Sequence, residues 1–204
     1  KLIVAIIFGI LTNTFAEVYF EDKNCHYQPM TNFNLEQYLK IDHAYVTHIK
    51  DGINSQFCRE LTTKLSNGTI ETTTESYDQI FGETLHYKMY CNGKQKNDSQ
   101  GEFSYECNNS DDPKKNPQDN YKLYTSVIDT DYEKYAILYW CAMYGVFTVD
   151  DILVLKTDKN GDNNKVEKFL QSKKMKLDKF LYSNSTYCDK VKNNGEKEEE
   201  KIGT

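Results

Sequence analysis

Motifs that carry chemistry are almost absent from this sequence. It contains no nucleophile motif, no glycine-rich phosphate loop and no Cys-x-x-Cys pair, and its four histidines are scattered. Zinc sites need closely spaced cysteine and histidine ligands, and the segment at residues 160–162 lacks the remaining ligands of a calcium-binding loop. We therefore expect no enzymatic activity, no catalytic residues and no metal.

Basic charge and long hydrophobic runs are also scarce. The 204 residues include 25 lysines and arginines against 31 aspartates and glutamates, which gives a net charge of −6. Binding to phosphates requires a basic surface, so a nucleic acid is excluded as the main partner. The main apolar run covers residues 2–11, and about ten residues are too few to cross a bilayer.

The apolar run behind Lys1 has instead the features of a secretion signal. Thr14 and Ala16 place small residues at positions −3 and −1 of a cleavage site. We predict that residues 1–16 are a signal peptide, that the mature chain begins at Glu17 and that the protein is secreted. A buried core helix is the alternative. No later segment is apolar enough to anchor the chain in a membrane.

Cysteines are the clearest feature that is present, and all six follow the predicted cleavage site: Cys25, Cys58, Cys91, Cys107, Cys141 and Cys188. An even number in a secreted chain indicates disulfides. Six cysteines allow 15 pairings, and their spacing does not choose among them. Four N-glycosylation sequons agree with a secretory route, and they lie at Asn67, Asn97, Asn108 and Asn184.

The middle of the chain has the composition and pattern of β-strands. Tyrosine and phenylalanine, which favour strands, number 16 and 10. Apolar and polar residues alternate in about eight short segments at intervals of roughly ten residues. Asn67-Gly68 and the turn at residues 129–131 each lie between two such segments, as in β-hairpins. Residues 33–40 predict a short helical turn, and residues 108–120 an exposed loop.

After the last strand the periodicity changes to that of a helix. Val166, Phe169 and Leu170 are spaced i, i+3 and i+4, which predicts a helix of about three turns. Residues 189–204 are highly charged and predict a disordered tail. The whole pattern predicts an all-β fold, an eight-stranded antiparallel up-and-down barrel with one C-terminal α-helix. The interior of such a barrel has room for about one small ligand.

Several segments match a known family in sequence and in order. They are AYVTHIKDG with FCRE (44–52 and 57–60), VIDTDYEKYAILYWC (127–141), DDILVLKTDKN (150–160) and the closing cysteine. The chain thereby resembles the salivary lipocalins of blood-feeding triatomine bugs, the triabin/procalin/pallidipin group, with the nitrophorins as more distant relatives. The resemblance implies a lipocalin (calycin) barrel over residues 17–188. It also implies three disulfides, Cys25–Cys141, Cys58–Cys188 and Cys91–Cys107.

Two departures from the family pattern bear on the interior. The Gly-x-Trp that usually begins the first strand is replaced by Asp-His-Ala at residues 42–44, so we expect a repacked barrel floor with Trp140 as the candidate. The position of the nitrophorin haem histidine corresponds to Ser76, and His86 lies in the next strand out of register. Haem ligation needs an imidazole in the cavity, so we expect no haem and no other cofactor.

Strand alternation selects candidate residues for a ligand cavity. If Cys141 forms its implied bridge on the outer wall, Leu138 and Trp140 point inward. By the same alternation Val46 shares a face with His48, whose imidazole offers a hydrogen bond to a ligand. The candidate cavity therefore consists of Val46, His48, Leu138 and Trp140, with ordinary core packing as the alternative. No carboxylate falls on an inward face assigned in this way.

The resemblance implies a function in blood feeding. We expect a secreted salivary protein that sequesters a small, eicosanoid-like host mediator and so inhibits platelet aggregation. An aromatic and aliphatic lining suits a lipid, whereas an amine would need a buried carboxylate. The rival hypothesis is a protein–protein inhibitor of a thrombin-like coagulation protease, which binds through mouth loops at residues 108–120 and Asp150-Asp151. A storage or structural lipocalin is the third alternative.

Overall fold

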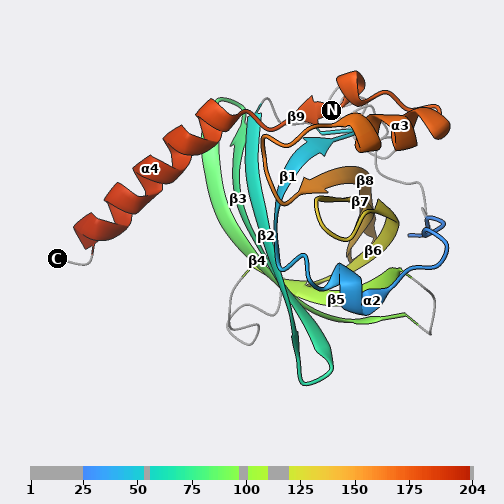
Figure 1. Cartoon of the computed structure of the whole chain (residues 1–204). Coiled ribbons are helices and arrows are strands. Elements are labelled where there is room, and N and C mark those ends of the chain that lie inside the picture. The colour runs from blue at the N-terminus through green and yellow to red at the C-terminus, as the bar shows by residue number, and fades with distance from the viewer. Residues whose placement is uncertain (1–24, 53–55, 97–100, 110–119, 203–204) are drawn as a thin grey trace, which may run out of the picture.

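The structure, a computed structural model, describes residues 25–52, 56–96, 101–109 and 120–202. The predicted signal peptide and the sequon at Asn97 lie outside these residues. The strands (Figure 1) are β1 His43–Ile49, β2 Gln56–Ser66, β3 Thr69–Ile80, β4 Glu83–Gln95, β5 Glu102–Asn108, β6 Tyr121–Thr130, β7 Tyr135–Tyr144, β8 Phe147–Lys156 and β9 Leu181–Tyr182. The helices are α2 Leu35–Tyr38, α3 Asn164–Ser172, the 3-10 turn η2 Leu177–Lys179 and α4 Ser185–Ile202.

The strands form one closed antiparallel sheet. Each strand from β2 to β8 pairs with the next one along the chain, and β1 pairs with both β2 and β8. The short β9 adds to β1 beside His48 and Ile49. The closed sheet confirms the predicted eight-stranded up-and-down barrel.

Local turn chemistry fixes the two predicted hairpins. Asn67 and Gly68 have φ angles of 51° and 76°, the left-handed conformation that two-residue hairpin turns need and that asparagine and glycine adopt readily. In the second turn, Asp131 Oδ1 accepts hydrogen bonds from the N–H groups of Lys134 at 2.8 Å and Tyr135 at 3.2 Å. Asp131 therefore serves as a turn former.

Side-chain alternation divides the barrel wall into an inner and an outer face. On β7, Ala136 and Leu138 belong to the interior cluster, whereas Ile137 and Tyr139 belong to an outer cluster. Helix α3 covers the outer cluster with two buried aliphatic residues. The alternation along β7 and the helix that follows the last long strand both agree with the prediction.

The end of the barrel at which β1 begins is closed by α2, the predicted helical turn. The side chain of Asn34 caps this short helix. Phe33 and Tyr38 pack against Phe103 on β5, with ring centroids 5.9 and 6.0 Å apart. These three rings close the floor. Trp140, the candidate from the sequence, instead lies opposite Asp151 on β8, nearer the other end.

Three disulfides fasten the chain ends and one strand pair, and their Cα–Cα distances are 5.7, 5.2 and 4.1 Å for Cys25–Cys141, Cys58–Cys188 and Cys91–Cys107. This is the pairing that the resemblance implied. The first two bonds join residues 116 and 130 positions apart. In the chain-entropy model, each closure of that length stabilises the fold by roughly 5 kcal/mol. Both ends of the domain are thereby held on the barrel wall.

The C-terminal segment differs from its prediction. The sequence predicts disorder over residues 189–204, but α4 continues to Ile202 and projects away from the barrel (Figure 1). Its beginning is held by the buried side chains of Tyr187, Cys188 and Val191, and the lysines and glutamates that follow are good helix formers. The barrel thus carries two C-terminal helices instead of one. Within the described residues, no helix combines the length and apolar character that a bilayer span requires.

Candidate ligand-binding site

The barrel end opposite α2 forms the mouth of the lumen. The mouth is defined by the β3–β4 turn at residues 81–82 and the β7–β8 turn at residues 145–146. Charged and aromatic side chains occupy the inner face near this end. Much of the remaining inner wall is aliphatic, and it includes Ala44, Val46, Leu123, Val127, Leu138, Leu153 and Leu155.

An ion pair between Arg59 and Asp78 lies on the inner face near the mouth. Arg59 follows the interior Phe57 by two residues on β2, and Asp78 lies opposite Phe57 on β3. Arg59 Nε and Nη2 donate to Asp78 Oδ1 and Oδ2 at 3.1 and 2.5 Å. The Tyr87 hydroxyl donates to the same Oδ2 at 2.8 Å. The carboxylate thus accepts three hydrogen bonds although Asp78 is only 2% exposed.

Arg59 keeps its charge because Asp78 compensates it. Burial acts to lower the pKa of Arg59, but the hydrogen bonds to Asp78 more than offset this effect and the pKa is raised. Burial raises the pKa of Tyr87 to about 12, so its hydroxyl stays protonated. A guanidinium has five N–H donors, and Asp78 uses only some of them. The Arg59 side chain is 21% exposed and therefore has donors left for a ligand.

A second carboxylate, Asp151 on β8, faces the lumen. It lies opposite Trp140, and its Oδ1 accepts a hydrogen bond from the Asp51 N–H at 3.0 Å. Burial raises the pKa of Asp151. This finding corrects the expectation that the inner face holds no carboxylate. The neighbouring Asp150 faces outward, where it accepts a hydrogen bond from the Tyr139 hydroxyl at 3.1 Å.

Three tyrosines add neutral polar groups to the interior. Burial raises the pKa of Tyr38, Tyr105 and Tyr121 well above the usual range, so all three remain protonated phenols. The Tyr121 hydroxyl donates to the Met89 sulfur at 2.9 Å. Phenols can donate and accept hydrogen bonds, so the aliphatic lumen also offers a few oriented polar contacts.

Several inner-face side chains are only half-buried. Leu61, Met89 and Trp140 pack against the interior cluster but retain partial exposure. In a closed barrel, inward-facing side chains can be exposed only toward the lumen or its mouth. Solvent therefore reaches these three side chains from the lumen or its mouth.

The structure separates one member of the sequence-predicted cavity set from the other three. Val46 and Leu138 belong to the interior cluster, and Trp140 packs against it. His48 does not, because the register of β1 shifts between Val46 and His48 and places His48 opposite Val154, which belongs to the outer cluster. A bulge of this kind reverses the faces of the residues that follow it. His48 is thus not a lumen residue.

The two positions considered for haem ligation, Ser76 and His86, lie on opposite faces of the barrel wall. Ser76 is fully buried and pairs with Tyr87 on the inner wall. His86 lies on the outer face, with its Nε2 2.9 Å from Glu75 Oε1 and its ring stacked on Tyr77 at 4.2 Å. Neither position presents an imidazole to the lumen.

Arg59, Asp78 and Tyr87 were missed by the reasoning from sequence. A signal existed, because Arg59 follows Phe57 by two residues and side chains two apart share a face. The usual expectation that charged residues of a strand face water hides this signal. The sequence also holds no arginine other than Arg59, which makes its interior position distinctive.

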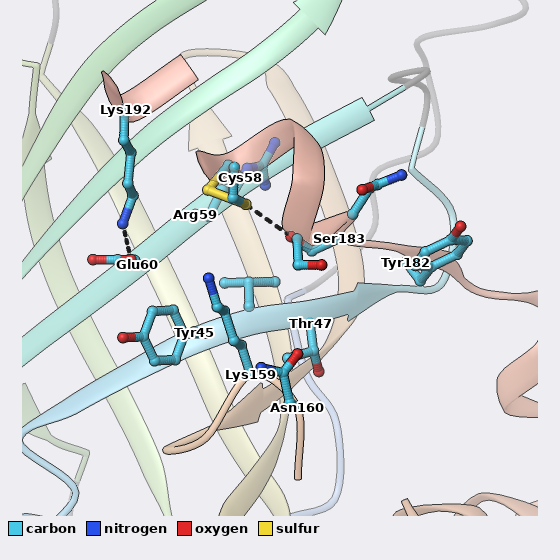
Figure 2. A pocket seen from close by; sticks show the side chains of 14 residues that line it. Tyr45, Thr47, Cys58, Arg59, Glu60, Lys159, Asn160, Tyr182, Ser183 and Lys192 are labelled. Carbon is cyan, nitrogen blue, oxygen red and sulfur yellow. Dashed lines mark hydrogen bonds and ion pairs between the residues drawn. A yellow bond between two sulfur atoms is a disulfide. The ribbon is translucent and has the colours of Figure 1, made fainter. Parts of the chain in front are cut away.

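A separate hollow lies outside the barrel, beside the start of α4 (Figure 2), and we call it the outer hollow. Its volume is about 360 Å³. It is lined by the outer faces of β1 and β2, the loop after β8, β9 and the first turns of α4, with side chains that include Tyr45, Glu60, Lys159, Asn160, Tyr182 and Asn184. Val46 and Arg59, which the inner face also presents, contribute to its lining as well.

A closed eight-stranded barrel with a plugged floor and an ion pair inside its mouth defines a binding protein of the lipocalin type. The chain belongs to the triabin family, whose model matches residues 16–168. It is 37% identical to pallidipin of Meccus pallidipennis over 195 residues, which cover 94% of this chain and 98% of that protein. It is 32% identical to "platelet inhibitor triplatin-2" of Triatoma infestans over 191 residues, which cover 92% and 99%.

Solved structures of other proteins share the fold. A point mutant of LTBP1 in complex with leukotriene C4 matches with a TM-score of 0.60 at 19% identity, covering 81% of this chain and 97% of that one. The tryptamine complex of the amine-binding protein of Rhodnius prolixus matches with a TM-score of 0.62 at 17% identity, covering 81% and 93%. The family and these lipocalin-fold proteins are non-enzymatic binding proteins.

Proposed function

We propose that this protein is secreted in saliva, traps a small host mediator in its lumen and so inhibits platelet aggregation. The relative named as a platelet inhibitor, which aligns over 92% of the chain, supports the effect on platelets. Three disulfides support an extracellular location. A trap binds one ligand per barrel, so its effect depends on its concentration and not on turnover.

The ligand class that suits the lumen best is an acidic lipid of the eicosanoid type. The observation that carries this choice is Arg59, the single arginine of the chain, placed inside an aliphatic lumen. Arginine–carboxylate hydrogen bonds are charge-assisted and strong, while the aliphatic wall offers contacts to a hydrocarbon chain. Asp151 favours an amine, but its Oδ1 already accepts backbone hydrogen bonds at 3.0 and 2.7 Å. Arg59 has more unused hydrogen-bonding capacity.

Titration calorimetry with matched ligands tests this proposal. We expect an eicosanoid acid to bind at one equivalent per barrel. Its methyl ester should bind at least tenfold more weakly, which corresponds to about 1.4 kcal/mol. Arg59→Lys, which keeps the charge but loses the planar fork, should reduce the difference between acid and ester. Preferential binding of a biogenic amine would change the proposed ligand class from an acidic lipid to an amine. The absence of heat with all of these ligands would reject the proposal that the protein traps a small mediator.

A second candidate function, inhibition of a coagulation protease, is favoured by the apolar rim of the mouth. Phe81, Leu85, Val146 and Val149 lie at or near the β3–β4 and β7–β8 turns and are 103%, 52%, 76% and 49% exposed. Exposed apolar patches often mark interaction sites. The loop expected to bind, residues 108–120, lies mostly outside the described residues.

Clotting time measured with the purified protein tests this second candidate. If the rim binds the protease, the protein prolongs clotting and the double variant Phe81→Ser with Val146→Ser loses the effect. Leu65→Ser is the matched control, because Leu65 is 57% exposed near the β2–β3 turn at the opposite end. Clotting times that the native protein leaves unchanged would reject protease inhibition. If Leu65→Ser loses the effect as fully as the rim double variant does, the rim is not the protease-binding surface.

A further inference from the structure

We propose that an N-linked glycan carried by Asn184 occupies the outer hollow (Figure 2). Its volume of about 360 Å³ falls within the usual range of small-molecule pockets, about 300–1,000 Å³. The proposal concerns the outer face of the barrel. It requires passage through the secretory pathway, but it does not depend on which ligand the lumen binds.

The sequon residue is oriented by the start of α4. Asn184 Oδ1 accepts hydrogen bonds from the N–H groups of Thr186 at 2.9 Å and Tyr187 at 3.3 Å, so it acts as a helix cap. The cap uses the amide oxygen only. Nδ2, the nitrogen to which a sugar is attached, takes no part in it. Asn184 lines the hollow, so a sugar attached there starts at its edge.

The modification itself needs a co-reactant, a lipid-linked oligosaccharide diphosphate, which the secretory pathway supplies. A bond forms between Asn184 Nδ2 and the anomeric carbon of the first sugar. The bond between that carbon and the diphosphate oxygen breaks, the diphosphate leaves as an anion, and Nδ2 gives up one proton. The amide oxygen is unchanged, so the cap of α4 is compatible with the product.

The lining of the hollow suits a neutral, hydroxyl-rich group. Its three cations are paired, because Lys159 Nζ lies 3.0 Å from Asp189 Oδ1, Lys192 pairs with Glu60, and Arg59 pairs with Asp78. Asn160 contributes an amide to the wall, and amides both donate and accept hydrogen bonds. A free anion or cation finds no uncompensated partner among these groups, whereas sugar hydroxyls bind to paired charges and amides alike.

The ring of Tyr182 adds an aromatic surface to the outer hollow. Tyr182 on β9 lines the hollow and is 62% exposed, and Figure 2 places it at the same edge as Ser183, next to the sequon. The faces of aromatic rings are electron-rich and attract weakly polar C–H groups. The apolar face of a sugar ring carries several such groups, so an exposed ring beside a glycosylated asparagine provides it with a stacking surface.

The other described sequons have different surroundings. Asn67 is exposed at the tip of the β2–β3 hairpin, and a Cβ placed on the adjacent Gly68 would meet no atom within 4 Å. A glycan there extends into solvent. Asn108 is 3% exposed and its Nδ2 donates to Asn120 Oδ1 at 2.5 Å, so the folded barrel does not accommodate a glycan on it. Asn67 is therefore the natural control for Asn184.

The test uses the full chain secreted from insect cells. Glycopeptide mass spectrometry gives the occupancy of each sequon, and peptide-N-glycosidase gives the rate of glycan release. We expect Asn184 to be occupied and its glycan to be released at least tenfold more slowly from the folded protein than after reduction and denaturation. A glycan on Asn67 should be released at similar rates in both states. Tyr182→Ala and Asn160→Ala should each speed release from folded protein at Asn184 alone.

Two results would overturn the proposal. One is an unmodified Asn184 in the secreted protein. The other is a release rate at Asn184 that is the same in folded and denatured protein, because a glycan that does not occupy the hollow has no protection. Both readouts are independent of the calorimetry that tests the lumen, so failure here leaves the proposed function untouched, and the converse also holds.

Discussion

At the scale of single residues, the placement of charge distinguishes this barrel. Arg59 and Asp78 lie inside it as a hydrogen-bonded pair. On the outer wall, Lys156 is only 4% exposed, and its ammonium donates to Gly161 O and to Asn163 Oδ1. Buried charges are tolerated only when such partners are present. Each of these positions therefore depends on a second segment of chain.

His48 gives this barrel a predicted acid sensitivity. Burial first, and then the charge of Lys156, lower the pKa of His48 from 6.5 to about 4. The unfolded chain therefore takes up this proton at a higher pH than the folded protein does. The contribution of His48 to stability is complete above pH 6.5 and is lost as the pH falls toward about 4.

Thermal unfolding from pH 7 to pH 4 measures the effect. The melting temperature of the native protein should fall more steeply than that of His48→Gln, with about 2–4 °C lost for each kcal/mol. His26→Gln is the control, because the His26 side chain is 63% exposed and its Nδ1 lies 3.3 Å from Glu102 Oε1, so its replacement should not make the fall in acid less steep. Parallel curves for the native protein and His48→Gln would contradict the prediction.

At the scale of elements, attachments between distant segments determine what is ordered. Helix α4 joins the barrel through Cys58–Cys188, through the cluster of Tyr77, Tyr187 and Val191, and through the ion pair of Lys192 with Glu60. The N-terminal segment is attached to a different strand, β7, by Cys25–Cys141. The first turns of α4 are therefore ordered by the barrel and not by their own length.

Removal of one disulfide should release α4 and leave the barrel folded. In Cys58→Ser with Cys188→Ser, we expect a loss of about 2–5 kcal/mol of unfolding free energy. Hydrogen exchange should rise first in α4, whose beginning loses its covalent attachment. Cys25→Ser with Cys141→Ser is the matched control, in which exchange should rise near the N-terminal segment instead. Equal exchange of α4 in both double variants would show that the disulfide is not what holds it.

At the scale of the whole molecule, the closed sheet divides the side chains of the wall between an inner face and an outer face. The lumen is reached through the mouth and carries the Arg59–Asp78 pair. The outer hollow is bounded by the same sheet and by α4. Because side chains of a strand point to alternate faces, adjacent residues such as Ile137 and Leu138 lie on different faces of the wall. The inner and outer faces of one barrel wall can therefore carry different sets of side chains.

The single tryptophan of the chain should report on the lumen. Trp140 faces inward and is half-buried, so a ligand in the lumen should change its fluorescence in proportion to occupancy. Titration of fluorescence and calorimetry should give the same dissociation constant. Trp140→Phe should keep the calorimetric signal, with an affinity within about tenfold, and lose the fluorescence change. One-to-one binding with unchanged fluorescence would place the ligand outside the lumen.

Much of this architecture follows from the sequence because it depends on local periodicity. The alternation along β7 separates Leu138 from Ile137, the turn residues at 67–68 fix a hairpin, and the spacing of Val166 and Leu170 sets a helix. Each pattern is complete within a few residues and needs no knowledge of partners. The cysteine pairing did not follow from spacing, and only resemblance to a family supplied it.

The remaining features were decided by tertiary structure. The bulge after Val46 turns His48 outward, in a part of β1 that pairs with both β8 and β9. Asp151 faces the lumen, and Arg59 meets Asp78, through register between strands that the sequence of one strand does not specify. Periodicity is a property of one segment, whereas register and closure are properties of the whole sheet. The sequence therefore determined the barrel, and the closed sheet determined which charges lie inside it.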